Sequence, residues 1–216
     1  MKYRGEIERA LETLRRGGVI AFPTETFYAL GADPRKRFAL ARLRRLKGRA
    51  RSQPLLLLAS SRAQALRLAG QPRPSHLQAL ARRLWPGPLT LVLPPSDRDL
   101  ARALGNSSGI AVRVTSHPLA RHLIRRYGFP ITGTSANHTG APPALSADQL
   151  GSCLRRRPDG VLDGGHTRGG RPSTILDLTS EPPRLLRTGA VSPSRIRPLL
   201  RPGRVAPSAR GPASGG

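Results

Sequence analysis

The chain has 216 residues and a formal net charge of +25, which predicts attraction to polyanions such as RNA and DNA but little specificity. This length is enough for one α/β domain that buries a core without cross-links. The single cysteine, Cys153, excludes an intrachain disulfide or a thiolate metal cluster from one chain, and it favours a reducing cytoplasm.

Two further readings follow from composition. The longest apolar run, residues 54–59, is too short to cross a bilayer, and the first residues lack the apolar core of a signal peptide. We therefore expect a soluble, cytoplasmic protein with no membrane contact. Because 34 of the 37 basic residues are Arg, the high charge has an alternative origin in the codon usage of a GC-rich genome.

Helical and strand patterns alternate along the chain, which predicts an α/β fold. Residues 198–216 are rich in Pro, Gly, Ser and Arg, so we predict a folded domain over 1–197 and a disordered basic tail after it. Helices are expected at 6–16, 37–46, 62–69, 75–84 and 118–126. Strands are expected at 19–22, 55–59, 89–93, 110–114, 130–133, 161–163, 174–178 and 184–187.

The segment PTETFYALGAD, residues 23–33, follows a predicted buried strand. Thr24, Glu25, Thr26 and Tyr28 are then placed where an α/β sheet presents loops to ligands, and a plain polar turn is the alternative. In a second loop, Lys47, Arg49 and Arg51 can converge on an anion. A solvated helix end is the alternative there.

Two later loops are also rich in small polar residues. Residues 130–144 contain Ser135 and Asn137 among several threonines and glycines, a composition that can wrap phosphates through backbone N–H groups. Residues 162–177 contain paired glycines before Ser173 and Thr174. Singly these loops are weak signals, but together they indicate an anion-binding cleft.

Familiar catalytic motifs are missing from the sequence. It has no GxxxxGK[ST] phosphate loop, no GxGxxG after a strand, no GxSxG nucleophile turn and no histidine spacing typical of metal ligands. We therefore expect no protein metal site. Without an evident nucleophile, a direct displacement supported by cations and Mg²⁺ is the easier mechanism to support.

The order of seven segments resembles the YrdC family of L-threonylcarbamoyl-adenylate synthases over about residues 17–190. They are PTETFYALGAD, LKGR with PLLLL, WPGPLTLVLP, GIAVRV, TGTSANHTG, DGG with RPSTILDL, and LLRTGA. The resemblance implies a single-domain twisted mixed sheet flanked by helices. It also implies a nucleotidyltransferase that uses L-threonine, bicarbonate and ATP with Mg²⁺, and whose product feeds tRNA modification through downstream transferase proteins.

Site residues are implied by the same resemblance. Thr26, Arg113 and Ser173 resemble the threonine contacts, with Arg113 on the carboxylate. The remaining residues resemble ATP contacts, of which Lys47 and Arg49 are expected to act in catalysis: Lys47, Arg49, Gln53, Ser135, Asn137 and Arg187.

The sequence departs from the family pattern at three positions. Gln53 replaces a usual Lys or Asn, so one phosphate contact is expected to be weaker or to come from Arg51. Leu58 stands where some members have His, within the threonine pocket. Ala29 replaces a glycine in a predicted tight turn. The chain resembles the short form of the family, which lacks a C-terminal domain.

Two alternatives stay open from the sequence. One is a noncatalytic ribosome-maturation protein that binds double-stranded RNA on a concave basic face. Direct binding of tRNA is part of this alternative. The other is an enzyme that forms a carbamoyl-adenylate from a different carbamate.

Overall fold

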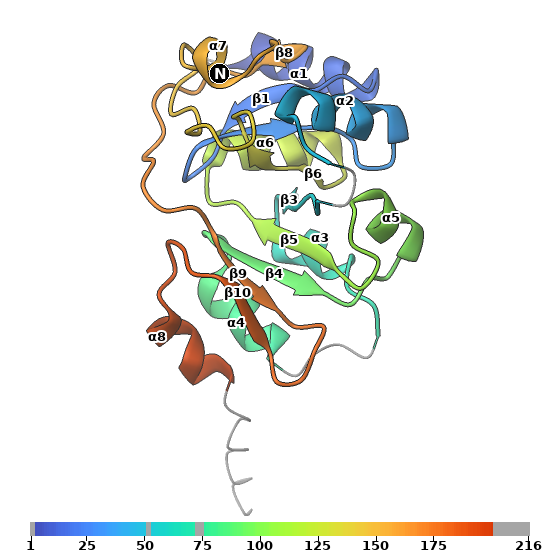
Figure 1. Cartoon of the computed structure of the whole chain (residues 1–216), viewed down its shortest axis with the longest axis vertical. Coiled ribbons are helices and arrows are strands. Elements are labelled where there is room, and N and C mark those ends of the chain that lie inside the picture. Colours follow the sequence, from blue (N-terminus) through green and yellow to red (C-terminus); the bar gives the residue numbers. More distant parts are fainter. Residues whose placement is uncertain (1–2, 51–52, 72–75, 201–216) are drawn as a thin grey trace, which may run out of the picture.

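The computed structural model describes residues 3–50, 53–71 and 76–200. In this part of the chain the strands form two mixed sheets that are flanked by helices (Figure 1). The small sheet has the order β7-β2-β1-β8 and the large sheet the order β10-β9-β4-β5-β3-β6. None of the described helices is long and apolar enough to cross a bilayer.

The small sheet separates two hydrophobic cores because its residues alternate between its faces. Ile20 and Phe22 pack with helices α1 and α6, whereas Ala21 and Leu30 pack with α2 on the opposite face. The elements of this half are β1 (Ile20–Pro23), β2 (Tyr28–Gly31), β7 (Thr134–Ser135), β8 (Gly160–Val161), α1 (Arg4–Arg15), α2 (Arg37–Lys47) and α6 (Pro118–Tyr127).

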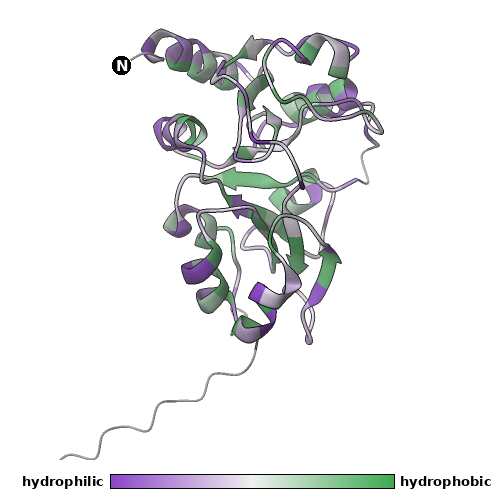
Figure 2. Ribbon diagram, turned by 90° about the vertical axis from the view of Figure 1, so that its left-hand side faces the viewer, coloured by the Kyte–Doolittle hydropathy of each residue, from purple (hydrophilic) through white to green (hydrophobic). Residues whose placement is uncertain are grey.

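The large sheet buries one face and turns the other toward the small sheet. Val112 and Val114 of β5 belong to the main core, and the alternate positions Ala111 and Arg113 line a cavity. Figure 2 shows that the strands are predominantly hydrophobic, whereas the helices combine both characters. The strands are β3 (Leu57–Ala59), β4 (Leu89–Leu93), β5 (Ile110–Val114), β6 (Ile131–Thr132), β9 (Thr174–Asp177) and β10 (Arg184–Arg187). The remaining helices are α3 (Arg62–Leu66), α4 (Leu77–Leu84), α5 (Arg98–Ala103), α7 (Leu150–Cys153), α8 (Pro193–Ile196) and the 3₁₀ helix η1 (Arg197–Leu200).

The predicted α/β class with twisted, helix-flanked sheets is confirmed, with the strands divided between two sheets. Strand β2 lies where a loop was predicted, because residues 28–31 pair antiparallel with β1. The tail prediction was wrong at its start, since residues 198–200 belong to η1, where Leu199 and Leu200 pack on the main core. The rest of the tail, Ser75 at the predicted start of a helix, and Arg51 lie outside the described residues.

One glycine connects the two sheets. Gly133 separates β6 of the large sheet from β7 of the small sheet, and its N–H donates to the Leu56 carbonyl at 3.0 Å. A Cβ atom at this position would lie 2.2 Å from Cγ of Leu58. The absence of a side chain therefore lets the chain pass from one sheet to the other directly over a buried leucine.

We predict that Gly133→Ala destabilises the protein by about 1–3 kcal/mol, because the added methyl group must displace Leu58 or the backbone. Urea unfolding followed by circular dichroism measures the change. Gly151→Ala in α7 is the matched control, since a Cβ there meets nothing within 4 Å. Equal unfolding midpoints for the two variants would contradict the close contact.

Candidate functional site

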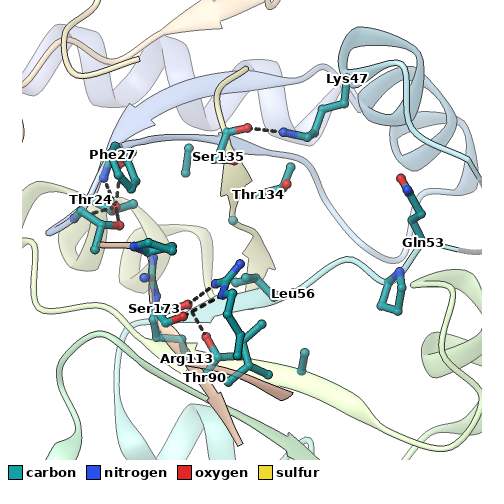
Figure 3. Close-up of a pocket in the computed structure, with 18 of the residues that line it drawn as sticks. Thr24, Phe27, Lys47, Gln53, Leu56, Thr90, Arg113, Thr134, Ser135 and Ser173 are labelled. Carbon is teal, nitrogen blue, oxygen red and sulfur yellow. Dashed lines mark hydrogen bonds between the residues drawn. The ribbon is translucent and has the colours of Figure 1, made fainter. Parts of the chain in front are cut away.

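A cavity of about 470 Å³ lies between the two sheets (Figure 3). Its lining comes from the β1–β2 turn, the end of α2, β7 and the inner face of the large sheet. All nine predicted site residues line this one cavity: Thr26, Lys47, Arg49, Gln53, Arg113, Ser135, Asn137, Ser173 and Arg187. The sequence alone does not show that these residues lie together, and the fold brings them to one cavity.

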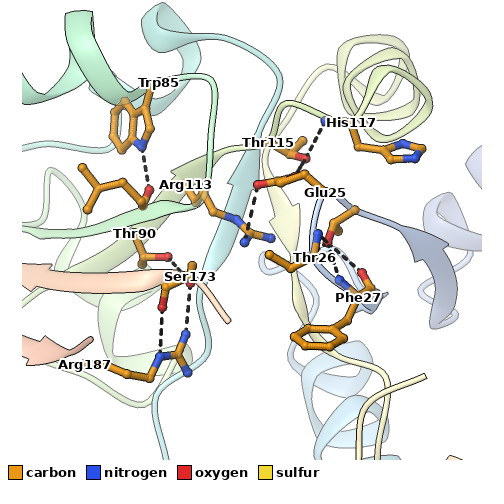
Figure 4. A network of polar contacts seen from close by, with 12 residues as sticks. Glu25, Thr26, Phe27, Trp85, Thr90, Arg113, Thr115, His117, Ser173 and Arg187 are labelled. Carbon is orange, nitrogen blue, oxygen red and sulfur yellow. Dashed lines mark hydrogen bonds and ion pairs between the residues drawn. The ribbon is translucent and has the colours of Figure 1, made fainter. Parts of the chain in front are cut away.

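Arg113 is a deeply buried cation of the cavity, with 4% of its surface exposed. Its guanidinium lies 3.5 Å from Oε1 of Glu25, and Thr115 Oγ1 donates to the other carboxylate oxygen (Figure 4). Burial lowers the pKa of Arg113 and the Glu25 charge opposes that change. Nε of Arg113 has no hydrogen-bond partner, so this buried cation still has an N–H group that can donate to an anionic ligand.

A second group of contacts surrounds Ser173, the residue directly before β9. Its hydroxyl lies 2.9 Å from Thr90 Oγ1, and Nη2 of Arg187 donates to the same hydroxyl at 3.0 Å. Nε of Arg187 also donates to the Ser173 carbonyl at 3.0 Å. These bonds hold Arg187 at the cavity, although its own strand, β10, is exposed along its length.

Lys47, also 4% exposed, fastens the end of α2 to the loop after β7. Its ammonium donates to the carbonyls of Ser135 and Asn137 at 2.6 and 3.0 Å, and to Asn137 Oδ1 at 2.9 Å. Thr139 returns two bonds to the Lys47 carbonyl, one from its N–H and one from its hydroxyl. The three N–H groups of Lys47 thus have three acceptors, which makes this side chain a support for the loop.

The other cavity residues are less constrained. Nη1 of Arg49 donates to Thr134 Oγ1 at 3.2 Å, Gln53 is exposed, and the Thr26 hydroxyl lies 3.2 Å from Thr24 Oγ1. Ser135 donates to Asn137 Oδ1 at 2.7 Å, next to the Lys47 ammonium. Cations and hydroxyl groups of this kind can bind phosphate oxygens and a carboxylate in the same cavity.

Electrostatics also indicates an anionic ligand. The pKa of Arg187 is lowered by burial and then by Arg113 and Arg49, and the pKa of Arg49 is lowered by burial and then by Arg44. No Asp or Glu belongs to the described lining. In the described residues no group of three potential metal ligands lies together either.

The structure corrects two sequence inferences and adds two contributors. Ala29 is an extended β2 residue, so it needs no positive φ. Leu58 packs in the core around α1 and α6, and Leu56 lines the cavity instead. Neither Glu25 nor Thr90 was given a binding role from the sequence. The carboxylate of Glu25 between two threonines could have indicated a partner for a buried cation. Thr90 gave no such signal, because it occupies an ordinary strand position.

Comparison with known proteins is consistent with this geometry. The Sua5_yciO_yrdC family model, described as telomere recombination, matches residues 12–189. A Stenotrophomonas maltophilia protein named threonylcarbamoyl-AMP synthase is 40% identical over 177 residues, 81% of this chain and 94% of its own. A Bacillus subtilis protein of the same name is 37% identical over 198 residues, 91% of this chain but only 57% of its own length.

Among solved structures, Pyrococcus abyssi Sua5 complexed with L-threonine superposes with a TM-score of 0.81 at 39% identity, covering 89% of this chain and 56% of that one. Fold and cavity together define a two-sheet α/β protein with a cavity between its sheets that is lined by cations and hydroxyl groups. The chain belongs to the Sua5/YciO/YrdC family. The expected family and its extent along the chain are thereby confirmed.

We predict that Lys47 holds the loop at residues 135–139 in its charged form. Burial, followed by the charge of Arg49, lowers the pKa of Lys47 to about 8. Above that pH the ammonium becomes an amine with two N–H groups, so one acceptor loses its donor. Hydrogen exchange of the Asn137 and Thr139 amides, corrected for intrinsic rates, should lose protection between about pH 7 and about pH 9.

Lys47→Met should show at least about tenfold lower protection at both pH values, because it removes three donated hydrogen bonds that are each worth about 1 kcal/mol. Arg49→Met is the matched control at about pH 7, since Arg49 donates to the Thr134 hydroxyl, outside this segment. Because this variant removes a charge that lowers the pKa of Lys47, its loss of protection should move to higher pH. Protection that is equal in wild type and Lys47→Met would remove Lys47 from this supporting role.

Proposed function

We propose that this protein is an L-threonylcarbamoyladenylate synthase, which makes threonylcarbamoyl-AMP and pyrophosphate from L-threonine, bicarbonate and ATP. The observation that carries the proposal is the buried Arg113 beside further cations and hydroxyl groups in one cavity. The name of the curated relatives and the threonine complex of P. abyssi Sua5 support the same reading. They favour it over a noncatalytic RNA-binding protein.

The proposed chemistry has two steps. The threonine amine attacks bicarbonate and forms a carbamate with loss of water. A carbamate oxygen then attacks the α-phosphorus of ATP, forming one P–O bond while the bond to the β-phosphate oxygen breaks and pyrophosphate leaves. Because negative charge accumulates on the phosphates, fixed cations and hydroxyl donors can supply much of the catalysis.

Each of the nine predicted site residues has a proposed role in these steps. Arg113 binds the threonine carboxylate, with Thr26 and Ser173 as further contacts. The ATP contacts are assigned to Lys47, Arg49, Gln53, Ser135, Asn137 and Arg187. Lys47 contributes in part through the loop that it supports, since its N–H groups already donate to Ser135 and Asn137.

Mg²⁺ is proposed to enter with ATP as part of the substrate. The described cavity lining offers no carboxylate, so phosphate oxygens would be its main ligands. We place the enzyme in the cytoplasm, where tRNA and the transferase proteins that consume its product are found. A single cysteine is consistent with that location.

The proposal predicts pyrophosphate release that requires threonine. Purified protein is incubated with ATP, Mg²⁺, bicarbonate and L-threonine, and a coupled assay follows pyrophosphate while mass spectrometry identifies the adenylate. Omission of threonine or bicarbonate should abolish release. Release that is independent of threonine, or none in the complete mixture, would contradict the activity.

For Arg113→Ala we predict a KM for threonine raised on the order of 100-fold, because a buried charged partner is worth a few kcal/mol. The KM for ATP should change much less. Arg126→Ala, which removes an exposed ion pair with Glu8, is the matched control. A near-normal threonine KM in a folded Arg113→Ala protein would refute the carboxylate assignment.

A further inference from the structure

A connection without helix or strand joins β8 of the small sheet to β9 of the large sheet. It spans residues 162–173, which we call the strap, and Figure 1 shows it in orange along one side of the molecule. Because no repeated backbone pairing holds the strap, its position depends on individual hydrogen bonds and close contacts. The strap touches both hydroxyl residues that the proposed function assigns to threonine, Thr26 and Ser173.

The middle of the strap fastens the turn that carries Thr26. The Gly169 N–H donates to the Thr26 carbonyl at 2.7 Å. Gly169 has a φ of 67°, and a Cβ atom there would lie 2.7 Å from Cδ2 of Leu145, so this position favours glycine. Two residues earlier, the Thr167 N–H donates to the Leu145 carbonyl at 2.8 Å. A shift of the strap would therefore move the backbone of Thr26.

The end of the strap places Ser173, which is 3% exposed, against the large sheet. The Ala190 N–H donates to the Pro172 carbonyl at 2.8 Å, and Nε of Arg187 donates to the Ser173 carbonyl at 3.0 Å. Thr26 belongs to the turn of the small sheet, so the strap bridges two binding residues that come from different sheets. The spacing of these two residues, and with it the width of the amino-acid site, thus depends in part on the strap.

The start of the strap is held by the hydroxyl of Tyr28, a fully buried residue of β2. This hydroxyl accepts from the Gly164 N–H at 3.1 Å, and its hydrogen is shared between Asp163 Oδ1 at 2.9 Å and the Gly165 carbonyl at 3.0 Å. Burial raises the pKa of Tyr28 well above its ordinary value, so the phenol keeps its proton. Three consecutive strap residues are therefore tied to one side chain of the small sheet.

We propose that Tyr28 is a positioning residue, which sets the spacing of Thr26 and Ser173 through the strap and thereby favours threonine over serine. Tyr28 belongs to the cavity lining, but its hydroxyl hydrogen already has two acceptors in the strap. It therefore acts on the substrate through the strap and not by donating to it. This inference rests on the proposed function, because it assigns a further residue to that reaction.

The choice between threonine and serine is a sensitive measure of this spacing. The two amino acids differ by one methyl group, and a site of fixed width can favour the larger one by about tenfold or more. A site whose width fluctuates loses part of that contact. A loosened strap should therefore lower selectivity, an effect that a loss of stability elsewhere in the fold does not produce.

The first test variant is Tyr28→Phe, which removes the hydroxyl and keeps the buried ring. We expect the KM for threonine in pyrophosphate release to rise about fivefold to about tenfold, and the ratio of kcat/KM for threonine over serine to fall at least about threefold. The KM for ATP should stay within about twofold, because the loop at Lys47 is fastened by bonds of its own.

Tyr127→Phe is the matched control. The Tyr127 hydroxyl donates to Asp33 Oδ2 at 2.6 Å, so this variant removes a phenol–carboxylate bond of the same kind, between residues outside the described cavity lining. It should leave the threonine KM and the selectivity unchanged. Asp163→Ala, at an exposed residue, removes the strap bond from its other side. Its effect on the threonine KM should not multiply with that of Tyr28→Phe, because both break one interaction.

Hydrogen exchange measures the strap without turnover. In Tyr28→Phe the Gly164 amide loses its acceptor, and a loosened strap should expose the Gly169 amide as well. We expect both amides, observed by NMR, to exchange at least about fivefold faster than in the wild type and in Tyr127→Phe. Unchanged exchange at Gly169 would show that the Tyr28 hydroxyl does not hold the strap near Thr26, and it would overturn the proposal.

The kinetic outcomes separate this inference from the proposed function. Equal rises of the threonine KM in Tyr28→Phe and Tyr127→Phe would overturn the inference, as would a parallel rise of the KM for ATP or an unchanged preference for threonine over serine. Any of these results with wild-type release intact rejects only the role of Tyr28. A wild-type protein without threonine-dependent release rejects the proposed function itself.

Discussion

Repulsion among the cations of one cavity is the constraint on which the site depends. Lys47, Arg49, Arg113 and Arg187 line this cavity, and burial lowers the pKa values of Lys47 and Arg187, which neighbouring cations lower further. Local partners offset this repulsion: Glu25 for Arg113, loop carbonyls for Lys47 and Ser173 for Arg187. In the proposed function an anionic substrate would complete the balance, which gives a physical reason to place a carboxylate and phosphates in the same cavity.

The division into two sheets makes this arrangement possible. Glu25 comes from the turn of the small sheet and Arg113 from a strand of the large sheet, so their ion pair joins the two sheets across the cavity. Gly133 joins them covalently, between β6 and β7. Both ends of the proposed reaction, the amino acid and the triphosphate, therefore meet groups that are held by a common framework.

Helix α2 serves two purposes at once. Its apolar residues pack on the small sheet, and its last residue supports a loop of the cavity. A helix can do this because successive side chains point in different directions around its axis.

Much of this protein was determined by its sequence alone. Short-range periodicity predicted most helices and strands, and the ordered segments predicted the family and nine residues that the fold brings to one cavity. Strand β2, the division into two sheets and the partners of Lys47 could not be predicted. Lys47 and Ser135 are 88 residues apart, and Glu25 and Thr115 are 90 apart. Local patterns record which residues favour a helix or a strand, whereas only tertiary packing decides which distant groups share a buried space.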